Sequence, residues 1–90
     1  MDIKELRMQI DEIDDQLVSL FVKRMEVSKE IGMYKLEHHL PILDPVREQE
    51  KLDAVAAKAG TDMAEYTRKL YTALFALSRS YQADNNEVTQ

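Results

Sequence analysis

Apolar side chains recur at alternating steps of three and four residues through the first third of the chain. The spacing predicts a helix that packs along one face against other helices, as in a coiled coil. No proline interrupts it before Pro41, so the helix should run for about 35 residues and span about 50 Å. This seam consists of Ile3, Leu6, Ile10, Ile13, Leu17, Leu20, Arg24, Val27, Ile31 and Tyr34.

A helix of that length is too long for the rest of a 90-residue chain to cover. A small domain buries little surface by itself, and a helix in water depends on packing of its apolar face for most of its stability. The pattern therefore predicts that the seam meets a second copy of the chain, which makes the protein a homodimer.

Two further helices are predicted after Pro41. Asp44 suits the N-cap of the first, Pro45 suits its first turn, and Gly60 suits its C-terminal cap. Asp62 should begin the last helix, with a glutamate three residues later that completes a capping-box pattern. That helix carries one apolar stripe and, beside it, an aromatic line that ends in two polar residues. The stripe is Tyr66, Leu70, Leu74, Leu77 and Tyr81, and the line is Tyr71, Phe75, Ser78 and Gln82.

These patterns predict an all-α fold with three helices per chain in one domain, residues 1–82, and a polar, disordered tail, residues 83–90. The net charge of −5 argues against a nucleic-acid or anionic-membrane partner. The chain has no cysteine, which excludes disulfides and thiolate metal ligands. Its first residues contain no apolar run, so we expect neither a signal peptide nor a membrane span, and a cytoplasmic location.

Arg24 occupies a seam position that its neighbours fill with apolar side chains. It is a residue that sets the register of the helices, a snorkelling arginine, or an arginine that binds an anion in a largely dry pocket. Lys35, eleven residues later, returns to within about 20° of the same face of the helix, about 16 Å away. Arg7 lies about 42 Å from Lys35 along a straight helix, so the two cannot share a site within one chain. An antiparallel partner could bring its own Arg7 close to Arg24.

Other polar residues have two readings. Arg47 and Glu48 by default form a surface ion pair, whereas a Gln82 buried in an aromatic line needs hydrogen-bond partners from the core or from a ligand. His38 and His39 fit a solvated helix end, so we expect no metal site. No catalytic triad order, glycine-rich phosphate loop or pair of catalytic carboxylates is apparent.

Three segments together resemble the all-helical class of chorismate mutases. They are LRMQIDEIDDQLVSLFVKRMEVSKEIGMYK, then DPVREQE, then ALSRSYQ, and their order and spacing span most of the chain. The resemblance implies an intertwined homodimer of three-helix chains that rearranges chorismate to prephenate without a cofactor, in the biosynthesis of phenylalanine and tyrosine. It also implies the roles of eight residues. Lys35 and Gln82 would be catalytic, Arg7 would act from the partner chain, and the other substrate-binding residues would be Arg24, Asp44, Arg47, Glu48 and Ser78.

Two alternatives remain at this point. A lyase on the same helical scaffold would eliminate pyruvate from isochorismate. A non-enzymatic helical dimerisation module would explain the seam, although it would not explain Arg24 within it or Gln82 in an aromatic line.

Overall fold

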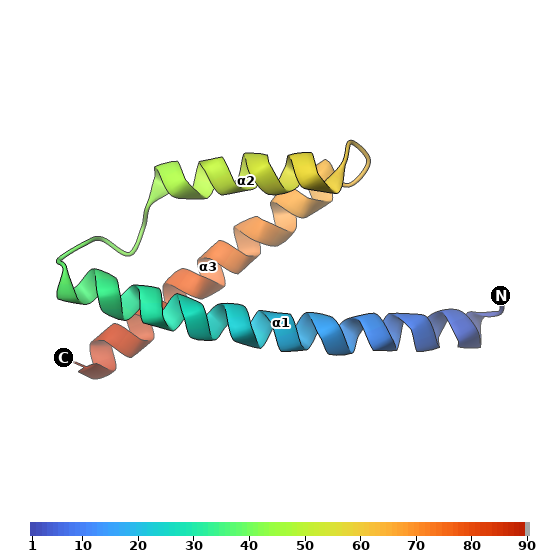
Figure 1. Cartoon of the computed structure of the whole chain (residues 1–90), viewed down its shortest axis with the longest axis horizontal. Helices are drawn as coiled ribbons and strands as arrows, with labels where there is room; N and C mark the ends of the chain where they lie inside the picture. The colour runs from blue at the N-terminus through green and yellow to red at the C-terminus, as the bar shows by residue number, and fades with distance from the viewer. Residues whose placement is uncertain (90) are drawn as a thin grey trace.

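The computed structural model describes residues 1–89 and begins with one helix, α1, over Ile3–Glu37 (Figure 1). Its 35 residues confirm the predicted long helix. The carboxylate of Asp2 caps the start, where it accepts a hydrogen bond of 2.9 Å from the backbone N–H of Glu5. After the helix ends, His39 adopts a positive φ of 55°. The chain therefore turns away from the helix axis before it reaches Pro41.

The second helix, α2, covers Pro45–Ala59, with the predicted caps at both ends. The side chain of Asp44 accepts a hydrogen bond of 3.1 Å from the backbone N–H of Arg47. Gly60 follows the helix with a φ of 87°, a conformation that side chains other than glycine rarely adopt. The sequence therefore determines both ends of α2 through local chemistry.

The third helix, α3, covers Ala64–Thr89, which corrects the prediction at both ends. It does not begin at Asp62, because the residues after Gly60 form a turn in which the N–H of Met63 bonds to the Gly60 carbonyl. The predicted disordered tail is also wrong for residues 83–89, which continue the helix. Asn86 contributes to this order, since its amide donates to the carbonyl of Gly32 on α1 at 3.3 Å. Residue 90 lies outside the described residues.

The three helices form a flat, open arrangement with extents of 53 × 28 × 13 Å. In Figure 1, α2 runs alongside the C-terminal half of α1, and α3 crosses behind them diagonally. Within residues 1–89, α3 packs against both other helices, whereas α1 and α2 do not pack directly against each other. The N-terminal end of α1 projects beyond α2 and α3 (Figure 1). Because α1 and α2 do not pack directly against each other, side chains can line the space between them.

Few apolar side chains are buried within one chain. Among the described residues, only Val55, Ala56 and Phe75 form a buried apolar core. The seam residues from Ile3 to Leu20 are 40% to 62% exposed. On α3, the stripe that contains Tyr66 is largely exposed, whereas Phe75, Ser78 and Gln82 on the neighbouring line are buried.

Candidate active site

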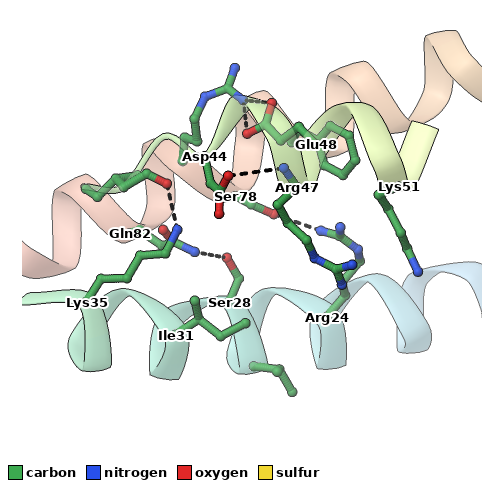
Figure 2. Close-up of a pocket in the computed structure, with 14 residues that line it drawn as sticks. Arg24, Ser28, Ile31, Lys35, Asp44, Arg47, Glu48, Lys51, Ser78 and Gln82 are labelled. Atoms are coloured by element: carbon green, nitrogen blue, oxygen red, sulfur yellow. Dashed lines mark hydrogen bonds and ion pairs between the residues drawn. The ribbon is translucent and has the colours of Figure 1, made fainter. Parts of the chain in front are cut away.

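A pocket of about 530 Å³ opens between the C-terminal half of α1, the connection before α2, the first turns of α2 and the middle of α3. Figure 2 shows its polar side chains converging from α1 on one side and from α2 and α3 on the other. Seven of the eight residues predicted from the sequence line this pocket. They are Arg24, Lys35, Asp44, Arg47, Glu48, Ser78 and Gln82.

Arg24 reaches from the seam of α1 toward α3. Its guanidinium donates a hydrogen bond of 2.8 Å to the hydroxyl of Ser78 and lies 5.8 Å from the ring centres of both Tyr71 and Phe75. Cation–π contacts and one hydrogen bond thus fix the planar group, while several N–H donors stay free for an anion. The arrangement favours anion binding over a snorkelling arginine.

Lys35 enters the same pocket from the last turn of α1. Its ammonium donates a hydrogen bond of 2.7 Å to the carbonyl of Ile42 in the connection before α2. Gln82 lines the same pocket (Figure 2). Across residues 1–89, neither Lys35 nor Arg24 forms an ion pair with a carboxylate. Both positive charges therefore remain available to a negatively charged ligand.

Gln82 is 6% exposed and lies where α3 crosses α1. Its amide nitrogen donates a hydrogen bond of 2.9 Å to the hydroxyl of Ser28, itself buried on α1. The amide oxygen Oε1 is buried without a hydrogen-bond partner. A hydroxyl can donate as well as accept, so the bond to Ser28 survives a 180° turn of the amide. In the turned form the N–H₂ group would take the place of the unpartnered oxygen.

Gly32 lets α3 come this close to α1. A Cβ atom at position 32 would lie 2.8 Å from Cγ and 2.9 Å from Cβ of Gln82, which is closer than real Cβ contacts. Hydrogen bonding to Ser28 and close contact with Gly32 together determine where the amide of Gln82 sits. Gln82 was predicted from the sequence as a site residue, whereas Ser28 and Gly32, which position it, were not.

The start of α2 forms the opposite wall of the pocket. Asp44 caps the helix, as described above, and the side chain of Arg47 is exposed without a carboxylate partner among residues 1–89. Glu48 does not pair with its neighbour Arg47. Both of its carboxylate oxygens accept hydrogen bonds from Nη1 of Arg79 on α3, at 2.6 and 2.5 Å. The default reading of Arg47 and Glu48 as a surface pair is therefore wrong.

Arg7 is the one predicted residue that does not reach the pocket. It is exposed near the N-terminus of α1, 17 positions before Arg24 and therefore about 26 Å away along the helix. This separation agrees with the inference that Arg7 cannot share a site with Lys35 of the same chain.

Comparison with known protein families identifies the family of the chain. The sequence model of chorismate mutase type II matches residues 6–83, which include all of α2, most of α1 and α3, and all eight predicted residues. The chain belongs to the chorismate mutase type II family. Within residues 1–89 the helices and the absence of strands agree with the all-helical fold expected from the resemblance.

Individual relatives agree with this family. The chain is 44% identical over 61 residues to a T-protein of Haemophilus influenzae, an alignment that covers 64% of this chain and 16% of the relative. It is 39% identical over 54 residues to a bifunctional chorismate mutase/prephenate dehydratase of Aquifex aeolicus, covering 60% of this chain and 15% of the relative. A chorismate mutase of Methanocaldococcus jannaschii is 34% identical over 53 residues, covering 59% of this chain and 54% of the relative. The chain thus matches only part of the length of each.

Seven residues that line the pocket were not predicted as site residues. They are Val27, Ser28, Ile31, Ile42, Lys51, Phe75 and Arg79. Ser28 follows Arg24 by one helical turn, Lys51 follows Arg47 by one turn, and Arg79 follows Ser78 directly. Helical spacing from Arg24 and Arg47 would have found Ser28 and Lys51. No sequence signal predicted that Arg79 pairs with Glu48 or that Gly32 touches Gln82, because both contacts join helices that are distant in sequence. Ile42 lies in the connection before α2 and contributes its carbonyl to Lys35.

The described residues were also searched for metal sites and for membrane-spanning helices. Across the described part of the chain, no group of three or more His, Cys, Asp or Glu side chains could hold a metal ion. No helix within residues 1–89 combines the length and apolar character needed to cross a membrane.

Proposed function

We propose that this chain is a chorismate mutase, which rearranges chorismate to prephenate without a cofactor. The observation that carries the proposal is the pocket itself, which gathers seven of the eight residues that the family resemblance implies. The reaction is unimolecular: one C–O ether bond breaks, one C–C bond forms, and no proton is transferred. The residues therefore need only hold the substrate in a reactive conformation and stabilise charge in the transition state.

The charge of the pocket suits a dianion. Its lining contains five cationic side chains, Arg24, Lys35, Arg47, Lys51 and Arg79, against the two carboxylates of Asp44 and Glu48. The chain as a whole carries a net charge of −5, so this local excess of positive charge stands out against an acidic background. In the proposed complex, Arg24 and Arg47 bind the two carboxylates of chorismate, since guanidinium groups match carboxylate geometry.

Charge that develops on the ether oxygen as its bond breaks requires donors that bind the transition state more strongly than the substrate. Lys35 supplies a positively charged donor, and Gln82, with its amide turned so that N–H₂ faces the substrate, supplies a neutral one. Glu48 accepts from the ring hydroxyl, and Asp44 and Ser78 help to orient the substrate. Ser78 also holds the guanidinium of Arg24, through the hydrogen bond of 2.8 Å between them.

The site is completed by a second chain in this proposal. The exposed seam of α1 is a contiguous apolar surface of the kind that marks an interface between proteins. An antiparallel partner helix would cover it and bring the partner's Arg7 toward Arg24. The homodimer thus supplies one further cation to each of two equivalent sites.

The first experiment adds chorismate to the purified protein and follows the loss of chorismate absorbance. Acid conversion of the product to phenylpyruvate identifies prephenate. Prephenate formed without added cofactor supports the proposal. Pyruvate formed from isochorismate in its place would favour the lyase, and no turnover of either compound by a folded dimer would favour the dimerisation module.

A second experiment tests the shared site. Arg7→Ala and Lys35→Ala each impair both sites of their own homodimer. A mixed dimer, however, has one site with an intact Lys35 from one chain and an intact Arg7 from the other. In an equal mixture about half of the dimers are mixed, and each of these has one intact site of two. Mixing the two variants after partial unfolding and refolding should therefore restore up to about a quarter of the activity of the unmodified dimer. If the mixture stays as inactive as the separate variants, Arg7 does not act across the interface.

A further inference from the structure

The ion pair between Glu48 and Arg79 lies inside the pocket rather than on an outer face. The side chain of Glu48 is 24% exposed and that of Arg79 is 35% exposed. The two residues come from α2 and α3, and Nη1 of the arginine reaches both carboxylate oxygens. Among residues 1–89, α2 and α3 are also linked by Arg68 and Asp53, but that pair is longer, at 3.7 Å, and lies outside the pocket.

Two physical problems arise for a glutamate that binds substrate in this pocket. Its negative charge would repel a substrate that carries two carboxylates, and its flexible side chain could leave the position where it meets the substrate. The positive charge of Arg79 answers the first problem because it compensates the carboxylate at contact distance. Contacts to both oxygens answer the second, because they restrict the rotation of the carboxylate.

The pair leaves Glu48 able to accept another hydrogen bond. An ionised carboxylate has about four lone-pair sites on its two oxygens. Arg79 uses one site on each oxygen, so acceptor sites remain for a hydroxyl group of the ligand. Arg79 thus compensates the negative charge of Glu48 and leaves it able to accept a hydrogen bond. This combination suits a hydroxyl group on a dianionic ligand.

We propose that Arg79 is a positioning residue, which acts through Glu48 by holding its carboxylate in place and compensating its charge for the substrate hydroxyl. The inference rests on the proposed function. The ring hydroxyl takes no part in the bonds that break and form, so its contact with Glu48 should be equally strong in the ground and transition states. Loss of Arg79 should therefore raise KM much more than it lowers kcat.

The test compares Arg79→Ala, Arg79→Lys and Arg68→Ala by steady-state kinetics with chorismate and by thermal unfolding. Arg79→Ala should lower kcat/KM about tenfold, through KM, which is the size expected for a hydrogen bond to a charged group. Arg79→Lys keeps the charge and should recover part of the loss. Arg68→Ala is the matched control, because it removes the other link between α2 and α3 and should leave KM unchanged.

A double-mutant cycle with Glu48→Ala decides whether Arg79 acts through Glu48. In that background, Arg79→Ala should change kcat/KM less than about twofold, because its effect depends on the glutamate. Independent, multiplying losses would overturn the inference and indicate direct contact of Arg79 with the substrate. Equal kinetics of Arg79→Ala and Arg68→Ala would reduce the pair to a structural link and also overturn it.

Failure of the proposed function would look different. No turnover of chorismate by the unmodified protein would overturn both proposals. Normal turnover by the unmodified protein together with an unchanged KM in Arg79→Ala would overturn only the role of Arg79.

Discussion

Replacing Gly32 with alanine changes the contact between α1 and the proposed catalytic Gln82 by a single methyl group. The added Cβ would lie 2.8 Å from Cγ of Gln82, about 0.6 Å inside the 3.4 Å at which ordinary van der Waals contact begins. Part of α3 must move by roughly that amount, because Cβ of Gln82, at 2.9 Å, is also too close and its Cα, at 3.4 Å, is already at the limit of ordinary contact.

The expected effects on stability and on activity differ in size. Overpacking should cost about 1–3 kcal/mol, and the better helix propensity of alanine offsets about 1 kcal/mol of that. The net loss in the free energy of unfolding is therefore about 0–2 kcal/mol. A displacement of about 1 Å can lower a rate about a hundredfold, so a shift of about 0.6 Å in Gln82 should lower kcat about ten- to a hundredfold.

Gly60→Ala is the matched control for this prediction. It introduces the same methyl group at a φ of 87° with no atom within 4 Å of the new Cβ. Backbone strain there should cost about 1–3 kcal/mol, yet no pocket residue is displaced. Both variants are characterised by chemical unfolding and by the rate of prephenate formation. If Gly32→Ala turns over at the rate of Gly60→Ala, the position of Gln82 does not depend on this close approach.

Three further predictions concern the pocket. Lys35→Ala should lose on the order of 3 kcal/mol or more of transition-state stabilisation, measured as kcat/KM with circular dichroism as the control for folding; near-normal turnover would exclude Lys35 from the mechanism. The unmodified protein should keep its kcat/KM between pH 6 and pH 8, because the amide of Gln82 donates a hydrogen bond at any ordinary pH. The variant Gln82→Glu should become more active as the pH falls, since a carboxyl group must be protonated to donate. Arg24→Leu removes a charge from an apolar seam but also the hydrogen bond to Ser78, so it should still fold in thermal unfolding while it loses chorismate binding. Unchanged affinity would contradict the role of Arg24.

The local features of the fold could be predicted from the sequence because their causes are local. The three-and-four spacing and the absence of an early proline predicted α1 with its full length, and Asp44 and Gly60 predicted the ends of α2. The predicted ends of α3 were wrong for a related reason. Polar composition after Gln82 favours disorder, but the contact of Asn86 with Gly32 joins residues 54 positions apart, and no local pattern contains it.

The sequence by itself determined the fold class, the family resemblance and the identity of seven side chains that the fold gathers in one pocket. Only the tertiary structure decided how those side chains are held. The bond between Gln82 and Ser28, the close approach at Gly32 and the pairing of Glu48 with Arg79 all join different helices. Such contacts depend on the distance and angle at which helices cross, which the packing of many side chains determines together.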